Sequence, residues 1–232
     1  MIFDPLYLLF MAPGLILGLY AQFKVKSTFA KYKKVGFQNG LTGAEVARAI
    51  LQTNDIHDVK VEEVQGFLSD HYDPRHKVLR LSPDVFRGRS VASAGIAAHE
   101  VGHALQHAKG YGPLAIRSTL VPIAQFGSMA WMWLLFAGMI VAGPLGQTFM
   151  IGALVAFGGA VLFQLVTLPV EYDASARALV ALRSGGILAV GEETGAKKVL
   201  NAAFLTYLAA LISSIMILLY ILMRSGLLSS ND

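Results

Sequence analysis

The sequence predicts a mainly α-helical integral membrane protein, with about four transmembrane helices and a small strand element in a segment outside the bilayer. The first observation behind this prediction is composition. Of the 232 residues, 55% are hydrophobic and only 15% are charged, whereas soluble domains usually carry about 25% charged residues. The second observation is that four long stretches of the chain carry no charge at all. Together these features exclude intrinsic disorder and argue against a purely soluble protein.

Four stretches are long enough to cross a bilayer, which takes about 20 residues of α-helix. We assign the transmembrane helices to residues 1–22, 119–142, 149–170 and 202–223. The first of them contains Pro13, Gly14 and Gly18. Because proline and glycine weaken a helix, this first span is predicted to be kinked or short.

Lysine and arginine lie almost entirely in the two segments between the spans, residues 23–118 and 171–201. These segments hold 14 and 4 of the 19 basic residues, while residues 143–148 hold none. By the positive-inside rule, both segments are expected to face the cytoplasm and both termini to lie outside. The net charge of +4 therefore reflects topology and attraction to an anionic lipid bilayer rather than binding to nucleic acid.

Residues 23–118 form the largest block outside the predicted spans. We expect a segment along the membrane surface, an amphipathic helix, a strand and a long apolar helix over residues 24–34, 41–52, 76–82 and 90–109. Thr42 and Glu45 have the spacing of a capping box, which predicts that the amphipathic helix begins there.

The long apolar helix carries His99, Glu100 and His103 in the pattern His-Glu-x-x-His. Helix positions i and i+4 share a face, so the two imidazoles can bind one zinc ion. Glu100 projects to a different side, from which it can take a proton from a water on the metal. The pattern predicts one zinc ion per chain and Glu100 as a catalytic base. The alternative is a helix whose two histidines are satisfied by hydrogen bonds.

A catalytic zinc usually takes a third protein ligand, and the chain has no cysteine. His107 lies one turn beyond His103, about 6 Å along the axis of a straight helix, and is a poor candidate. Glu171 is better placed, because it directly follows the third span and opens residues 171–183, which are predicted to be helical. Asp173 is its rival. For both carboxylates, the alternative is an ordinary polar helix end.

Further candidates surround this predicted centre. Upstream lies a polar cluster, which could line the site or form a solvated loop: Asp70, His71, Asp73 and His76. Arg177 could neutralise the oxyanion of a tetrahedral intermediate or pair with Asp173. The oxyanion could equally be held by Tyr72 or His71. We therefore place His71 and Arg177 beside Glu100 as candidate catalytic residues.

Several segments together resemble the bacterial membrane zinc metallopeptidases of the YugP type, over nearly the whole chain. Besides the early span, these segments are residues 70–74 (DHYDP), 79–83 (LRLSP), 97–104 (AAHEVGHA) and 171–175 (EYDAS). The wider arrangement is similar to HtpX and the zinc CAAX prenyl proteases, which also place two spans between the His-Glu-x-x-His helix and a glutamate ligand. The resemblance implies a gluzincin-like site, with His99, His103 and Glu171 on zinc and Glu100 as base.

One position departs from that pattern. The HtpX-like proteins have Glu-x-x-x-Asp, whose aspartate orients a zinc histidine, whereas this chain has Ser175 at the aspartate position. Asp173 lies nearby but out of register. Either residue could take the orienting role.

These features predict a zinc endopeptidase in the bacterial inner membrane, with its site facing the cytoplasm. Its substrates would be peptides or proteins, with membrane proteins as one candidate class, paired in extended form with the strand at residues 76–82. The alternative is a non-catalytic, zinc-stabilised membrane adaptor or assembly factor, which leaves Glu100 without a task. A transporter is disfavoured because spans two to four contain no Asp, Glu, Lys, Arg or His.

Overall fold

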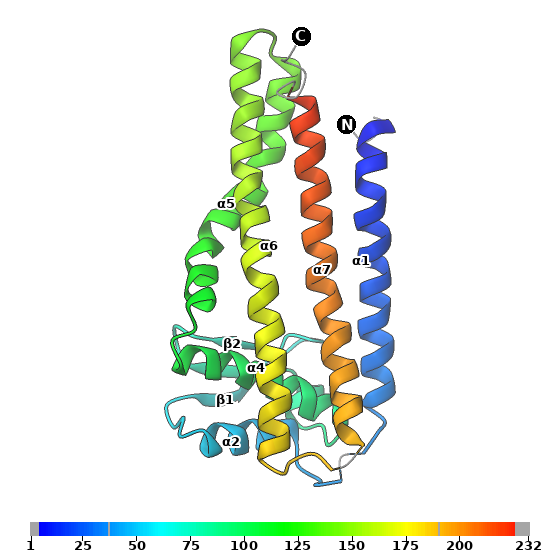
Figure 1. The fold of residues 1–232 in the computed structure, drawn as a ribbon, viewed down its shortest axis with the longest axis vertical. Coiled ribbons are helices and arrows are strands. Elements are labelled where there is room, and N and C mark those ends of the chain that lie inside the picture. Colours follow the sequence, from blue (N-terminus) through cyan, green and yellow to red (C-terminus); the bar gives the residue numbers. More distant parts are fainter. Residues whose placement is uncertain (1–4, 37, 190, 226–232) are drawn as a thin grey trace. The chain divides into compact units, whose positions relative to one another are not determined.

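The computed structural model describes residues 5–36, 38–189 and 191–225 (Figure 1). The helices are α1 (Pro5–Tyr32), α2 (Gly43–Thr53), α3 (Pro83–Phe86), α4 (Val91–Ala108), α5 (Gly112–Ile140), α6 (Pro144–Ser184) and α7 (Glu192–Arg224). The strands are β1 (Lys60–Glu63), β2 (His71–Asp73) and β3 (Val78–Leu81). Four helices, α1, α5, α6 and α7, are long and apolar enough to cross a membrane by length and composition. The predicted mainly helical class, with four such helices and a small strand element, is confirmed.

The chain divides into two compact units. The first takes in residues 1–20, 115–169 and 206–232, and the second takes in residues 21–114 and 170–205. The predicted spans fall largely within the four long helices, but their bounds there stay predictions. The first four residues of the first predicted span lie outside the described residues.

The first unit is built from long apolar helices. Trp131 and Phe157 form part of its core, with ring centroids 4.9 Å apart. Large apolar side chains also point outward, as Trp133 and Ile140 do with 77% and 82% of their surface exposed. Exposed apolar surface of this size fits helices that lie in lipid, where an apolar face needs no protein cover.

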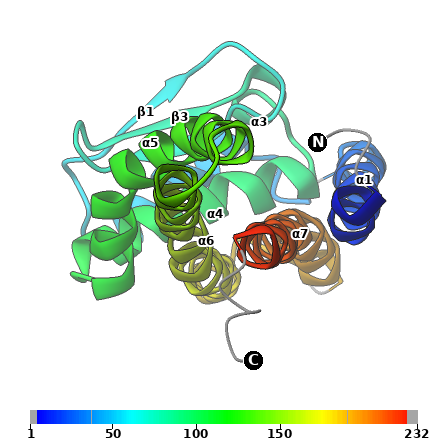
Figure 2. The same cartoon turned by 90° about the horizontal axis from the view of Figure 1, so that it is seen from above.

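The second unit holds the strands and the shorter helices. Its sheet has the order β1-β3-β2, with β1 parallel and β2 antiparallel to β3. Leu79 of the central strand is fully buried. The helix α4 packs against both β2 and β3, and Figure 2 shows the sheet along one side of this helix.

The sheet corrects one prediction. Residues 76–82 were expected to pair with substrate, but their strand, β3, is hydrogen-bonded on both sides, so this prediction is wrong. The sequence pattern did not reveal β1 and β2, because they have only 4 and 3 residues and carry charged or polar side chains. The outer edges of the sheet belong to these two strands.

The helix starts follow the local sequence. Thr42 caps α2 through a capping box, in which its hydroxyl accepts from the Glu45 amide and the Glu45 carboxylate accepts from the Thr42 amide at 2.7 Å. Ser90 caps α4 by accepting from the Ser93 amide. Residues 24–34 were expected along the membrane surface; in the structure residues 24–32 continue α1 as far as Tyr32, and their place relative to a membrane stays a prediction. No glycine or proline interrupts this stretch, so the helix continues.

Candidate metal centre

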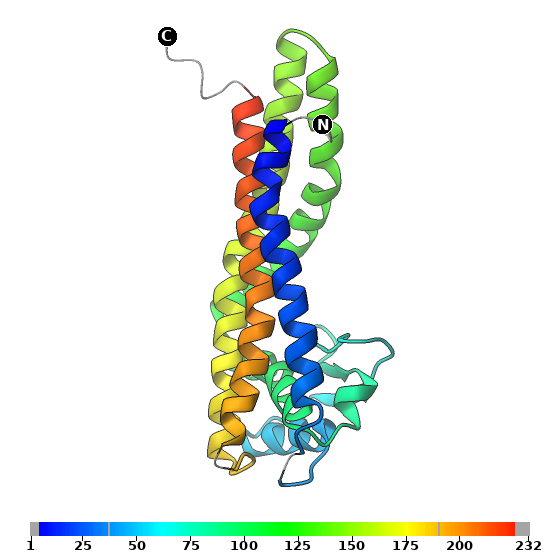
Figure 3. The same cartoon turned by 90° about the vertical axis from the view of Figure 1, so that its right-hand side faces the viewer.

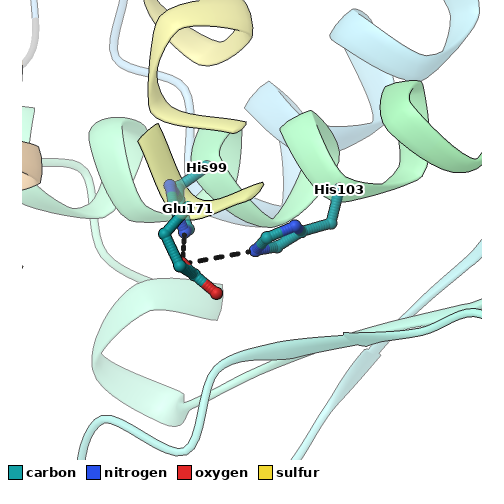
Figure 4. Close-up of side chains that lie close together, drawn as sticks. All are labelled: His99, His103 and Glu171. Carbon is teal, nitrogen blue, oxygen red and sulfur yellow. Dashed lines mark hydrogen bonds and ion pairs between the residues drawn. The ribbon is translucent and has the colours of Figure 1, made fainter. Parts of the chain in front are cut away.

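The centre forms where α4 and α6 cross within the second unit. A methyl group built on Gly102 of α4 would lie 2.3 Å from the carbonyl oxygen of Ala174 on α6. Only glycine therefore allows the two backbones to approach so closely. This approach brings Glu171 of α6 to His99 and His103, which lie one helical turn apart on α4 (Figure 4).

One ligand atom from each of His99, His103 and Glu171 lies within 4.8 Å of the others. The Glu171 Oε2 atom is 3.1 Å from His99 Nε2 and 3.6 Å from His103 Nε2. The side chain of Glu171 is 1% exposed, and those of the two histidines are 12% and 9% exposed. Three ionisable side chains thus converge where water scarcely reaches them, an arrangement that is stable only when the groups bind each other or a shared cation.

The other nitrogen of each imidazole is held by a separate partner. His99 Nδ1 lies 3.0 Å from Ser175 Oγ, and His103 Nδ1 lies 3.0 Å from the side-chain oxygen of Gln106. An amide oxygen only accepts hydrogen bonds, so His103 carries a proton on Nδ1, and Nε2 is the nitrogen that can present a lone pair to a metal ion. Both rings therefore turn Nε2 toward Glu171, as a shared metal ion requires.

The partner of His103 is itself held firmly. Gln106 is fully buried, and its amide nitrogen donates at 2.8 Å both to the Val170 carbonyl and to the Asp173 carboxylate. These two acceptors fix the amide, so its oxygen must face His103. Asp173 also accepts from Arg177 Nε at 2.5 Å. A chain of contacts therefore runs from His103 through Gln106 and Asp173 to Arg177.

Electrostatic interactions favour the ionised form of both Glu171 and Asp173. Burial alone would raise the pKa of Glu171, but hydrogen bonds with His103 and His99 outweigh it and hold this pKa well below its ordinary value. Burial likewise opposes ionisation of Asp173, yet Arg177 and Gln106 lower its pKa overall. Glu171 is thus a charged carboxylate, the form that binds a metal ion.

The other candidate residues on α4 and α6 occupy different places relative to the cluster of His99, His103 and Glu171. Glu100 is buried on α4, one residue after His99, with 8% of its surface exposed. Asp173, the rival ligand, lies outside the cluster of three and contacts Gln106 instead. Arg177 pairs with Asp173, and its guanidinium lies 5.5 Å from the centre of the Tyr111 ring. This pairing was one of the two alternatives that the sequence left open.

The upstream candidates lie on and around β2. His71 is exposed, with Nδ1 2.8 Å from the Ser69 carbonyl oxygen and Nε2 3.4 Å from Arg80. Among the described residues, no hydrogen bond or ion pair joins His71 to the three clustered side chains. Tyr72 bonds His107 at 2.8 Å, between its hydroxyl and Nδ1 of the ring. His107 is exposed and also lies outside the cluster.

The remaining members of the upstream cluster hold the β2–β3 hairpin together. Asp70 accepts from the Ser82 amide at 2.8 Å. Asp73 accepts from the Arg75 amide at 3.0 Å and lies 2.7 Å from His76 Nδ1. The Asp70 contact joins the open end of the hairpin and the Asp73 contacts close its turn, so the two aspartates and His76 have structural partners there.

Gln106 is the residue of this centre that sequence reasoning missed. Its signal was its place three residues after His103 on one helix, a spacing that puts the two side chains on neighbouring positions of one face. The sequence alone does not say that Val170 and Asp173 complete its hydrogen bonds, because that depends on the crossing of α4 and α6.

Comparison with known proteins adds an independent finding. A protein family described as "Putative neutral zinc metallopeptidase" matches residues 7–226. The chain belongs to this family. It is also 47% identical, over 219 residues, to the "Putative membrane protease YugP" of Bacillus subtilis (strain 168), covering 94% of this chain and 96% of that protein. No solved structure matches the chain. The family and the cluster of two histidines and one glutamate both point to zinc.

Proposed function

We propose that the protein is a membrane-embedded zinc endopeptidase whose metal is held by His99, His103 and Glu171. The observation that carries this proposal is the donor set itself. Two imidazole nitrogens and one buried carboxylate oxygen converge, and this combination is typical of catalytic zinc sites, in which a further position is left to water or substrate. The proton on His103 Nδ1, held by Gln106, leaves the correct nitrogen for the metal.

Zinc, when bound at this centre, polarises the scissile carbonyl and makes a water molecule acidic enough to be deprotonated near neutral pH. Glu100 is the proposed general base. Its carboxylate takes a proton from the attacking water and later delivers a proton to the amine that leaves. Ser175 and Gln106 keep the two imidazole rings oriented throughout.

Arg177 and His71 take different roles in this proposal. Because Arg177 is paired with Asp173, we assign it to the support of Gln106 rather than to the substrate oxyanion. His71 lies exposed on β2, an edge strand that packs against α4. An extended substrate would add to the outer edge of β2, since strand addition satisfies the backbone hydrogen bonds of both partners. His71 and Tyr72 would then flank the bound peptide.

The proposed location is the bacterial inner membrane, with the metal centre on the cytoplasmic side. The distribution of lysine and arginine supports this orientation. Substrates would therefore be cytoplasmic peptides or cytoplasmic segments of membrane proteins.

The test is cleavage of an unstructured peptide library by the full chain, purified in detergent and loaded with zinc. Glu100→Gln should retain zinc and lose turnover by a factor on the order of 10³ or more, because general base catalysis and water activation act together. Glu171→Ala should lose both zinc and turnover. Glu62→Gln, an exposed glutamate on β1, serves as the matched control and should retain both.

The zinc content of each variant makes the outcomes distinct. Full activity in zinc-loaded Glu100→Gln would overturn the assigned base. Zinc binding without cleavage in the unmodified protein, across the whole library, would instead favour the non-catalytic adaptor.

A further inference from the structure

A second polar site lies in the same unit, between the last turns of α1 and the first turns of α7. These segments lie side by side (Figure 3). The cavity between them has a volume of about 520 Å³. Three lysines line it, Lys24 and Lys31 from α1 and Lys198 from α7. Neither the metal centre nor the proposed peptidase reaction uses these residues.

Helix periodicity explains why these side chains meet. On α1, the lining residues Lys24, Thr28 and Lys31 follow one another at intervals of four and three, which places them on one face. On α7, Lys198 and Asn201 share a face by the same rule. A polar face of α1 therefore lies opposite a polar face of α7 across the cavity.

Close approach of the two helices sets one end of the cavity. A methyl group built on Gly195 of α7 would lie 2.8 Å from Cε1 of Tyr32 on α1. Tyr32 itself lines the cavity. The glycine thus lets α7 pack directly against the end of α1, and the gap beside this contact is left to the polar side chains.

The described residues that line the cavity include three positively charged lysines but no negatively charged side chain to balance them. Within the described part of the chain, no carboxylate lines it and none of its three lysines forms an ion pair. Other lysines of this unit do find partners, since Lys33 pairs with Asp84 and Lys77 pairs with Asp58. The three lysines are exposed, so water screens much of their mutual repulsion, and an anion between them would be attracted by all three.

The position of the cavity along the chain indicates the source of that anion. Lys24 is the first charge after the uncharged residues 5–23, and Lys198 is the last charge before the uncharged residues 199–223. Both lysines therefore mark the boundary where an apolar helix gives way to polar sequence. Ala202 and Leu205 line the cavity on the side of the α7 apolar stretch. A ligand at this boundary meets lysines at one end and apolar side chains at the other.

We propose that this cavity binds the phosphate headgroup of an anionic phospholipid. The three lysines would neutralise the charge, and Thr28 and Asn201, which also line the cavity, would donate hydrogen bonds to the phosphate oxygens. Ala202 and Leu205 would contact the first carbons of the lipid. Basic residues directly beside a membrane span are the usual means of attracting anionic headgroups.

The test uses native mass spectrometry of the delipidated full chain in neutral detergent, with phosphatidylglycerol or phosphatidylcholine added back. Both lipids carry a phosphate, but only phosphatidylglycerol has a net negative charge. We expect retention of phosphatidylglycerol over phosphatidylcholine. The triple variant Lys24→Gln/Lys31→Gln/Lys198→Gln should weaken phosphatidylglycerol binding by at least about tenfold, because each lysine near a membrane surface contributes to the attraction.

A matched triple variant removes the same charge from neighbouring lysines that do not line the cavity, Lys26→Gln/Lys34→Gln/Lys197→Gln. It should change phosphatidylglycerol binding by less than about twofold, since these three lysines do not line the cavity and contribute only the general attraction of a basic surface. An equal loss in both triple variants would overturn the site, because it would reflect general attraction by a basic surface. Equal retention of phosphatidylcholine would overturn the requirement for an anionic lipid.

Soluble phosphates distinguish the source of the anion. Glycerol 3-phosphate and inorganic phosphate, added at the same concentration as the lipid, should leave phosphatidylglycerol bound. Displacement at that concentration would overturn the lipid assignment in favour of a soluble phosphate compound. None of these readouts depends on zinc or peptide cleavage, so the lipid site is tested independently of the proposed peptidase function.

Discussion

His99 and His103 lie one turn apart on α4, yet their rings are supported in different ways. His99 has one partner on Nδ1, the hydroxyl of Ser175. His103 is held by the buried Gln106, which in turn is fixed by Val170 and Asp173. A serine hydroxyl can rotate to suit either state of its neighbour, whereas an amide fixed at both ends cannot. The His103 side of the centre should therefore be more rigid, and more sensitive to substitution, than the His99 side.

The largest loss of stability and zinc binding is expected from a substitution that disturbs the contacts of both His99 and His103. In Gly102→Ala the new methyl group would meet the Ala174 carbonyl at 2.3 Å, so α4 and α6 must move apart and Glu171 must leave both histidines. We expect the free energy of unfolding to fall by about 1–3 kcal/mol or more, with loss of zinc binding. Thermal unfolding and zinc content of the detergent-purified protein measure both effects.

Gly95→Ala is the matched control on the same helix. A methyl group at Gly95 would lie 3.5 Å from Ala196, which is an ordinary contact distance. Because alanine favours a helix over glycine by up to about 1 kcal/mol, this variant should be as stable as the unmodified protein or more so. If Gly102→Ala behaved like Gly95→Ala, the close crossing of α4 and α6 would not be what assembles the centre.

The next largest effect is expected from a substitution that removes the support of His103 but leaves that of His99. Gln106→Leu keeps a side chain of similar size but removes the acceptor for His103 and the donor to Val170 and Asp173. Each polar group left unsatisfied in a buried position costs about 1–3 kcal/mol. Zinc affinity should fall by about 100-fold, at the upper end of what loss of an orienting partner causes. Competition with a fluorescent chelator measures that affinity.

Ser175→Ala is the corresponding change on the other side. It removes one hydroxyl from His99 and leaves the contacts of His103 intact. We expect zinc affinity to fall by about tenfold and stability to change little. An affinity loss equal to that of Gln106→Leu would contradict the inferred difference between the two supports.

The sequence predicted what helix geometry alone determines. His99 and His103 share a face because they are four residues apart, and α4 (Val91–Ala108) forms close to the helix predicted over residues 90–109. Glu171 was inferred from the order of spans and segments, since the end of the third span had to return to the side that holds α4. The structure places all three side chains together.

Tertiary contacts determine what the sequence left open. The rival roles of Asp173 and Ser175 could not be decided before the crossing angle and register of α4 and α6 were known, because both residues follow Glu171 within one turn or so. In the structure Ser175 contacts His99, and Asp173 contacts the partner of His103. Strands β1 and β2 escaped prediction for a similar reason, since only their pairing with the apolar β3 makes such short polar segments strands.

The smallest effect is expected at the far end of the His103 support. Arg177→Gln removes the charge that pairs with Asp173 but leaves Gln106 bonded to both Asp173 and Val170. Because Arg177 acts on His103 only through two intervening groups and is partly open to solvent, zinc affinity should fall by only a few-fold, at or below the low end for orienting partners. Arg177→Lys should restore most of this loss, since a lysine can still pair with the carboxylate. The measurement is the same chelator competition, read beside peptide cleavage. Cleavage could instead drop far more than zinc affinity and fail to recover with lysine. This result would assign Arg177 to binding the substrate oxyanion, because that role depends on the guanidinium itself.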